Sequence, residues 1–176
     1  MTVLFEKAQK IKLVAFDVDG VLTDGQIIYT DSGTEVKAFN CKDGQGMNML
    51  VHSGYITAII TARVSSIVER RAKDLNITHV CQGAKNKIMA LSEILEMYDF
   101  GLDEVAFVGD DFPDICILDK VGLACCPADA VDEVKNVCHF ISDKKGGEGA
   151  VRDVVNLILK SSGKLERFLA HRALGQ

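Results

Sequence analysis

Several features are scarce or absent in this sequence of 176 residues. It has two prolines, no tryptophan, and no apolar run of the roughly 18 residues that a membrane-spanning helix needs. The net charge is −5 and the basic residues are scattered. Clustered lysines and arginines are what bind nucleic-acid backbones, so nucleic acid is not expected as a partner. We therefore expect neither a membrane protein nor a nucleic-acid-binding protein.

The cysteines and histidines also lack a pattern. None of the six cysteines forms a Cys-x-x-Cys pair, and the four histidines are scattered along the chain. This spacing predicts neither a zinc site nor a disulfide framework, and reduced thiols in a cytoplasm are the simpler interpretation. The first ten residues are mixed and charged, without the apolar segment of a signal peptide. We expect a cytoplasmic protein.

What the chain does contain is an alternation of short β-branched runs with segments of helical period. This alternation predicts a doubly wound, Rossmann-like α/β fold, a parallel sheet with helices on both faces. The length favours one domain over residues 1–176. The expected strands are Lys12–Phe16, Thr57–Ile60, His79–Cys81, Glu104–Val108 and Gly122–Cys125. The expected helices are about Gly44–His52, Ser65–Leu75, Asn86–Tyr98, Phe112–Lys120, Asp129–Val137 and Gly149–Ser161.

Three segments depart from this alternation. Gln26–Tyr29 and Glu35–Phe39 alternate apolar and polar residues around a Asp-Ser-Gly turn, which predicts a β-hairpin inserted at about residues 25–41. The other connections are too short to hold a cap domain. The glycine-rich stretch Gly146–Gly149 is interpreted as a hinge, and the C-terminal tail, about residues 162–176, is expected either to dock on a neighbour or to fray.

Polar side chains follow the predicted strands at the points where these strands end. In open α/β sheets, ligands bind outside the carboxyl ends of the strands, so we expect these side chains to share one site. The residues are Asp17, Asp19, Thr61, Arg63, Lys87, Asp110, Asp111 and Asp114. Carboxylates this close need a counter-ion, and a set of oxygen ligands favours Mg²⁺ over zinc.

This set of residues predicts phosphoryl transfer. A carboxylate can attack phosphorus, and Asp17, directly after its strand, suits that role. Asp19 lies two residues on, where it can protonate the leaving oxygen and later deprotonate the attacking water. Thr61 and Lys87 would hold the phosphoryl oxygens. Asp110 would complete the metal shell, with Asp111 or Asp114 supporting it.

The motifs DVDGVLTDG, TAR and GDDxxD, with a lysine after the third strand, resemble in order and spacing the four motifs of the haloacid dehalogenase superfamily of phosphatases. The likeness covers nearly the whole chain. More narrowly, the chain resembles the small capless branch that acts on 3-deoxy-D-manno-octulosonate 8-phosphate (KDO 8-phosphate) or on nine-carbon sialic-acid-type 9-phosphates. The supporting features are the DGVLTDG extension, the hairpin, Phe39–Gly44, Arg71 and Gly146–Asp153.

The resemblance implies roles for individual residues. It implies that Asp17 is the nucleophile and a metal ligand, that Asp19 is the acid and base and offers its backbone carbonyl to Mg²⁺, and that Asp110 is the third protein ligand. The positions that match the family's substrate pocket are Asp19, Asn40, Cys41, Lys42, Asp43, Gly44, Asn48, Arg63, Arg71 and Lys87. Arg63 and Asp74 favour the KDO branch, whereas Asn40, Lys42 and Asn48 depart from the residues usual there.

The function implied by the resemblance is Mg²⁺-dependent hydrolysis of a sugar-acid phosphate, with KDO 8-phosphate as the expected substrate, in bacterial lipopolysaccharide precursor synthesis. It also implies a homotetramer whose neighbouring chains cover the active site.

Other interpretations stay open on the sequence alone. One is a phosphatase for nine-carbon 9-phosphates. A signalling receiver domain also carries an acceptor aspartate, an acidic pair, a threonine and a lysine at strand ends, but it has no use for an acid at Asp19. A third is an inactive scaffold with the same fold. Arg63 and Arg71 can equally be read as solvated surface charges.

Overall fold

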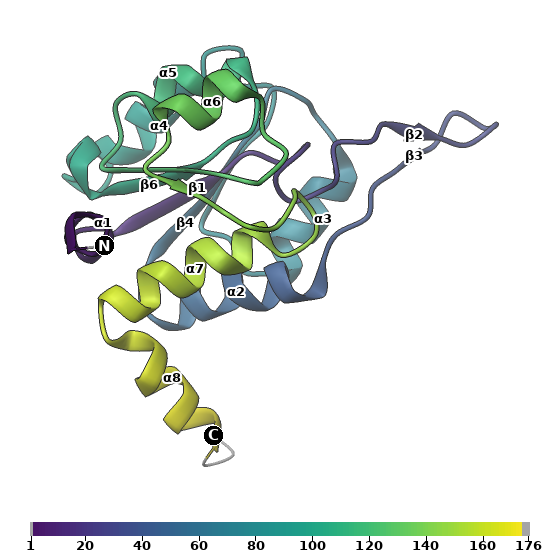
Figure 1. Ribbon diagram of the computed structural model, residues 1–176. Coiled ribbons are helices and arrows are strands. Elements are labelled where there is room, and N and C mark those ends of the chain that lie inside the picture. Colours follow the sequence, from purple (N-terminus) through teal and green to yellow (C-terminus); the bar gives the residue numbers. More distant parts are fainter. Residues whose placement is uncertain (1, 174–176) are drawn as a thin grey trace.

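The computed structural model describes residues 2–173, in which a six-stranded sheet carries helices on both faces (Figure 1). In spatial order the strands are β5 (His79–Cys81), β4 (Ile56–Ile60), β1 (Leu13–Phe16), β6 (Val105–Val108), β7 (Leu123–Cys126) and β8 (Phe140–Ile141). All neighbouring strands in this sheet pair in parallel. The predicted doubly wound α/β fold is confirmed.

Two cores form on the two faces of the sheet. Val14 and Phe16 of β1 face one core, while Leu13 and Ala15 face the other. One face is covered by α1 (Thr2–Gln9), α2 (Cys41–His52), α3 (Ser66–Asp74) and α7 (Ala150–Ser161), and the other by α4 (Lys87–Glu96), α5 (Ile115–Leu118) and α6 (Asp132–Val137). Because both faces are buried, the central strands are continuous apolar runs in the sequence. No helix within residues 2–173 is long and apolar enough to cross a membrane.

Three elements were not predicted. Helix α1 packs Ala8 on the core beside α7, and strand β8 has only two residues, too few to show a period. The predicted tail contains α8 (Lys164–Ala173), whose Leu165 and Phe168 pack against the core of the same chain. Residues 174–176 of that tail lie outside the described residues. The predicted helix from residue 112 begins instead with a 3₁₀ turn, Phe112–Asp114, that leads into α5.

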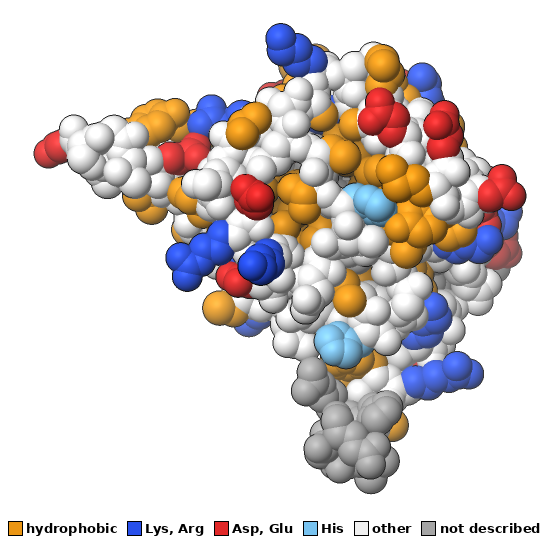
Figure 2. All heavy atoms as spheres, turned by 180° about the vertical axis from the view of Figure 1, so that it is seen from behind, with side chains coloured by type: hydrophobic (Ala, Val, Ile, Leu, Met, Phe, Trp, Pro, Cys, Tyr) orange, Lys and Arg blue, Asp and Glu red, His pale blue; other side chains and the backbone are white. Residues whose placement is uncertain are grey.

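The predicted hairpin is present and projects from the body of the molecule (Figure 1). Its strands β2 (Ile28–Tyr29) and β3 (Glu35–Val36) are shorter than expected. Ile27, Ile28, Tyr29 and Val36 are 42–60% exposed, and hydrophobic side chains are visible along the projection in Figure 2. A two-stranded ribbon is marginally stable alone, and these apolar side chains are not covered by the rest of the chain.

Candidate active site

The sheet brings the predicted strand-end residues to one edge. Strand β1 lies between β4 and β6, so the chain departs from β1 to both sides, and such a switch point is where open α/β sheets bind ligands. Asp17 follows β1, and its backbone N–H donates to the carbonyl of Val108 at the end of β6 (2.9 Å). Thr61 follows β4 and is buried. Asp110 comes two residues after the end of β6.

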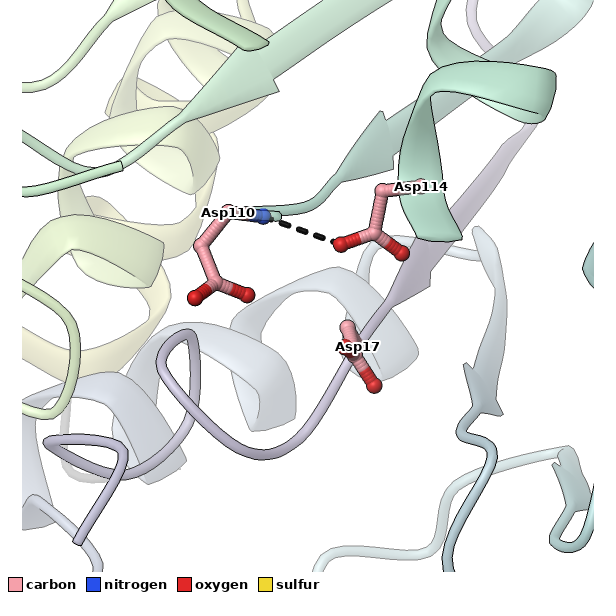
Figure 3. A group of neighbouring side chains, drawn as sticks. All are labelled: Asp17, Asp110 and Asp114. Carbon is pink, nitrogen blue, oxygen red and sulfur yellow. Dashed lines mark hydrogen bonds between the residues drawn. The ribbon is translucent and has the colours of Figure 1, made fainter. Parts of the chain in front are cut away.

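Three carboxylates form what we term the acid cluster: Asp17, Asp110 and Asp114. One oxygen of each lies within 4.8 Å of the others; Asp17 follows β1, whereas Asp110 and Asp114 both lie in the segment after β6 (Figure 3). The Lys87 ammonium joins the cluster, 2.8 Å from Asp17 Oδ2 and 2.6 Å from Asp114 Oδ1. Lys87 is the first residue of α4, a helix capped by the Asn86 side chain. The structure therefore places Lys87 beside two strand-end carboxylates, and its role in catalysis stays a prediction.

Asp114 supports the other members of the cluster. Its side chain is fully buried, with one oxygen on Lys87 and the other accepting the backbone N–H groups of Asp110 (3.0 Å) and Asp111 (3.4 Å). Both oxygens are therefore engaged by the protein. The exposed Asp111 side chain caps the turn that follows, accepting from the N–H of Phe112 (2.8 Å).

Asp17 and Asp110 have unfilled hydrogen-bonding capacity. The Oδ1 atom of each is buried and has no hydrogen-bond partner within residues 2–173. Burial and the Asp114 charge raise the pKa of Asp17, against the opposing effect of Lys87. Burial and the neighbouring carboxylates raise the pKa of Asp110 to about 8. Burial disfavours the Lys87 ammonium, but the charges of Asp17 and Asp114 outweigh it and raise the pKa of Lys87.

These oxygens fit a divalent cation. When all three carboxylates of the acid cluster are ionised, they face the single ammonium of Lys87, which leaves an excess of two negative charges. A bound Mg²⁺ ion would balance that excess, and the carboxylate oxygens of Asp17 and Asp110 are ligands of the kind it prefers.

The glycine of the Asp-x-Asp-Gly motif is required by this packing. Gly20 has φ +85°, and a Cβ atom at this position would overlap Asp110 Oδ2. The buried hydroxyl of Thr23 accepts the backbone N–H groups of Gly20 (3.4 Å) and Gly25 (3.2 Å), which closes the loop after β1. The DGVLTDG segment is thus a tight turn that lies against a cluster carboxylate.

Asp19 belongs to a different group of charges, which we term the charge ring: Asp19, Lys37, Glu35 and Arg63. The Lys37 ammonium pairs with Asp19 Oδ1 and lies 3.6 Å from Glu35 Oε1. The Arg63 guanidinium lies 2.7 Å from Glu35 Oε1 and 3.4 Å from Asp19 Oδ2. Signs alternate around the ring, and it ties the base of the hairpin to the loops after β1 and β4. The sequence analysis did not identify Glu35 and Lys37 as site residues.

Four of the expected substrate residues line one pocket, namely Asn40, Asp43, Gly44 and Arg71. The Arg71 guanidinium lies over the ring of Phe39, 5.5 Å from its centroid, and against Gly44, where a Cβ atom would overlap it. Asp43 also has a structural task, because its oxygens accept the backbone N–H groups of Gly149 (3.1 Å) and Arg152 (2.8 Å). The remaining predicted residues of α2 lie outside the lining of this pocket: Cys41 and Lys42, which are exposed, and Asn48, which is half-buried.

The glycine-rich stretch predicted as a hinge is held against the loop after β1. Gly147 donates its N–H to Val21 (3.0 Å), and its carbonyl accepts from the side chain of Asn40 (3.1 Å). Gly146 donates to Asp129 Oδ1 (2.9 Å), and a Cβ atom on Gly146 would overlap the carbonyl of Gly20. These glycines permit a close backbone contact, which is a different role from that of a hinge.

The comparisons with known proteins agree with this geometry. Residues 51–154 match the family model of haloacid dehalogenase-like hydrolases, and the chain belongs to this family. It is 43% identical over 160 residues to the 3-deoxy-D-manno-octulosonate 8-phosphate phosphatase KdsC of Escherichia coli (strain K12). The aligned region covers 91% of this chain and 85% of the relative.

Two solved structures are similar over almost the full chain. The 3-deoxy-D-manno-octulosonate 8-phosphate phosphatase of Moraxella catarrhalis, in complex with a magnesium ion, a phosphate ion and KDO, has a TM-score of 0.95 and 43% identity, covering 97% of this chain and 98% of the other. A probable YrbI family phosphatase of Pseudomonas syringae has a TM-score of 0.95 and 44% identity, covering 100% and 99%.

Proposed function

We propose that this chain is a Mg²⁺-dependent phosphatase that hydrolyses KDO 8-phosphate to KDO and phosphate, in the synthesis of lipopolysaccharide precursors. The observation that carries the proposal is the acid cluster at the end of β1, in which Lys87 holds Asp17 and two buried carboxylate oxygens have no hydrogen-bond partner among residues 2–173. The similarity to KDO 8-phosphate phosphatases over nearly the full chain supports the substrate. Membership of a hydrolase family favours this activity over a receiver domain.

Asp17 is the proposed nucleophile. One of its oxygens is fixed by Lys87 at 2.8 Å, and the other makes no hydrogen bond to the described residues. One oxygen of this carboxylate would ligate Mg²⁺, and the other would attack phosphorus in line with the leaving group and form an aspartyl-phosphate. The Lys87 ammonium and the Thr61 hydroxyl would hold the phosphoryl oxygens while the charge on them is redistributed.

The proposed metal site would consist of Asp17, Asp110 and the backbone carbonyl of Asp19, supported by Asp111 and Asp114. A Mg²⁺ ion held there supplies positive charge next to the phosphoryl oxygens and so stabilises the transition state. Without that charge, the carboxylates of the acid cluster would repel the anionic substrate.

Asp19 is the proposed general acid and base. Its carboxylate lies in the charge ring rather than in the acid cluster, so it is separate from the group that attacks phosphorus. We infer that it protonates the oxygen of the leaving sugar and then accepts a proton from the water that hydrolyses the aspartyl-phosphate. Arg63 and Arg71 are the proposed contacts for the anionic sugar acid, with Asn40, Cys41, Lys42, Asp43, Gly44 and Asn48 as the other proposed substrate residues.

A side-by-side kinetic comparison tests the substrate. We expect kcat/KM with Mg²⁺ to be higher for KDO 8-phosphate than for a nine-carbon sialic-acid-type 9-phosphate, because Arg63 and Asp74 resemble the residues of the KDO branch at these positions. The reverse preference would move the chain to the nine-carbon branch. No turnover of any phosphate ester would leave an inactive scaffold as the better interpretation.

We also propose that residues 1–176 act as one domain within a homotetramer in a bacterial cytoplasm. The apolar side chains exposed on the hairpin support the assembly, since pairing with the hairpins of neighbouring copies would cover them and satisfy the strand edges. Hairpins packed in this way would also shield the strand ends from water, which strengthens each charge contact there.

Light scattering on an Ile28→Asp variant tests this assembly. Ile28 lies in β2 and is 44% exposed, so a charge there is expected to break the hairpin contacts without disturbing the core. We expect a smaller particle and lower activity on KDO 8-phosphate. A fully active monomer of 19.2 kDa would contradict the proposal. Asp31→Asn at the exposed hairpin tip is the matched control and should stay assembled.

A further inference from the structure

The guanidinium of Arg63 is held along one of its edges only, the edge formed by Nε and Nη2. Its Nη2 nitrogen lies 2.7 Å from Glu35 Oε1 and 3.4 Å from the hydroxyl of Tyr29, and its Nε lies 3.4 Å from Asp19 Oδ2. The Nη1 nitrogen makes no hydrogen bond to any described residue, and the side chain is 43% exposed. A guanidinium carries donors on all three nitrogens, so this one keeps a donor pair for an external anion.

Glu35 is itself fixed by the body of the protein. Its second oxygen accepts from the hydroxyl of Ser65 (2.7 Å), and the backbone N–H of Ser65 donates to Gln82 Oε1 (2.7 Å). The Ser65 hydrogen bond, together with that of Arg63, lowers the pKa of Glu35. Both carboxylate oxygens of Glu35 are therefore held, one by a buried serine and one by the arginine.

The use of Ser65 is unusual for its position. Ser65 immediately precedes α3, where a serine side chain commonly accepts a backbone N–H from the first helical turn. Here it makes no capping hydrogen bond, and its hydroxyl donates to Glu35 instead. Helix α3 therefore has no side-chain cap from Ser65, and the Ser65 hydroxyl holds Glu35 instead.

We propose that Glu35 is a positioning residue for substrate recognition, which fixes the Arg63 guanidinium so that Nη1 is presented to the carboxylate of the sugar acid. The proposal rests on the proposed function, in which Arg63 contacts that group. An exposed arginine samples many rotamers, and ordering it before the ligand arrives lowers the entropic cost of binding. Because Glu35 belongs to β3, the hairpin would influence substrate affinity through this contact.

The opposite role, in which Glu35 competes with the substrate for Arg63, fits the contacts less well. Glu35 occupies Nη2 and leaves Nη1 open, and its anchor on Ser65 opposes displacement. Loss of the Glu35 charge would leave Arg63 and the buried ammonium of Lys37 sharing Asp19 as their partner. Two like charges then repel each other, and the exposed arginine is the one able to move away.

Steady-state kinetics of Glu35→Gln test the proposal. We expect KM for KDO 8-phosphate to rise about tenfold with kcat changed much less, because a lost orienting contact weakens binding of the sugar acid without touching the phosphoryl group. Ser65→Ala should shift KM in the same direction by less. Asp31→Asn is the control, because it removes an exposed carboxylate at the tip of the same hairpin. The KM of this variant should match that of the wild type.

A double-mutant cycle separates positioning from a general structural effect. In an Arg63→Ala background, Glu35→Gln should cause no further rise in KM, since its effect passes through Arg63. A KM effect that persists in that background would overturn the proposal. A lower KM in Glu35→Gln alone would also overturn it, because that result identifies a competitor.

Arginine side-chain NMR decides the question without any substrate. In the wild type the Nε–H resonance of Arg63 should report a restricted side chain, and in Glu35→Gln a mobile one. An unchanged resonance would overturn the positioning role. Wild-type protein that hydrolyses p-nitrophenyl phosphate but not KDO 8-phosphate would instead count against the proposed substrate, and the NMR result would still show whether Glu35 holds Arg63.

Discussion

The acid cluster and the charge ring lie at the same end of the sheet but are balanced differently. The acid cluster sets three carboxylates against the ammonium of Lys87, and two of its buried oxygens have no hydrogen-bond partner in the described part of the chain. The charge ring has two anions and two cations, and each faces an opposite charge. The unbalanced group is suited to take up a cation and a phosphoryl group, whereas the balanced group is suited to hold loops in place.

Removal of one carboxylate from each group is the strongest test of this difference. Asp17→Asn should lower kcat by roughly 10⁴-fold or more, because an amide is not a nucleophile. Its metal-free Tm should not fall, since the raised pKa of Asp17 means that the ionised side chain is poorly accommodated there. Asp19→Asn should also lower kcat, because an amide cannot act as the acid and base, but it breaks the balanced ring and should lower Tm as well.

Assays of kcat and calorimetry on both variants check this contrast. Asp24→Asn serves as the control, because Asp24 is an exposed acid of the same loop. A lower Tm in metal-free Asp17→Asn would show that the acid cluster is not overloaded with negative charge.

Asp114→Asn should have the next largest effect. Its carboxylate holds Lys87 at 2.6 Å and two backbone N–H groups, and it is fully buried. We expect the free energy of unfolding to fall by about 3 kcal/mol, as for other broken buried pairs. We expect kcat to fall about 10–100-fold through misplacement of Lys87 and Asp110. Urea unfolding and kinetics measure the two losses, with the exposed Asp119→Asn as control. Full activity with an unchanged unfolding midpoint would remove the supporting role of Asp114.

The smallest expected effect concerns pH. The pKa of Asp110 is raised to about 8 in the metal-free fold. The folded chain therefore keeps a proton that the unfolded chain releases near pH 4, and stability from this group falls as pH rises between about 4 and 8. Mg²⁺ must displace that proton, so the rise in Tm on adding Mg²⁺ should be larger at pH 8 than at pH 6.

Thermal scans with and without Mg²⁺ at the two pH values test this expectation. In Asp110→Asn the pH dependence of the Mg²⁺ effect should weaken, because the group that titrates is gone. A Mg²⁺ effect on Tm that is equal at both pH values in the wild type would mean that Asp110 does not couple proton loss to metal binding.

Much of the fold and of the acid cluster was predictable because the signals are local. Buried strands are continuous apolar runs. Asp17 and Thr61 directly follow two of them and Asp110 comes two residues after a third, so the parallel sheet alone brings them together. The position of Lys87 was predictable on the one further assumption that α4 begins at that edge of the sheet. The roles of these residues in catalysis stay predictions until the variants are measured.

The charge ring was not predictable for the opposite reason. Glu35 and Lys37 lie at the base of a short ribbon, and nothing in the order of residues shows that their side chains reach Asp19 and Arg63. Ser65 was expected at a helix start, but its hydroxyl donates to Glu35 and does not cap the helix. Similarly, the glycines at residues 146–149 were interpreted as a hinge, because a sequence does not distinguish freedom of motion from a close backbone contact.

The close backbone contact of Gly146 and Gly147 means that insertions are tolerated differently there than at the hairpin tip. Gly146 and Gly147 lie against the backbone of the loop after β1, so inserted residues there would push apart two segments that frame the acid cluster. At the hairpin tip, no atom lies within 4 Å of the place a Cβ would take on Gly33. An affinity tag or a fluorescent reporter placed at Gly33 should therefore leave the acid cluster intact, whereas the same insertion at Gly146 should disrupt it.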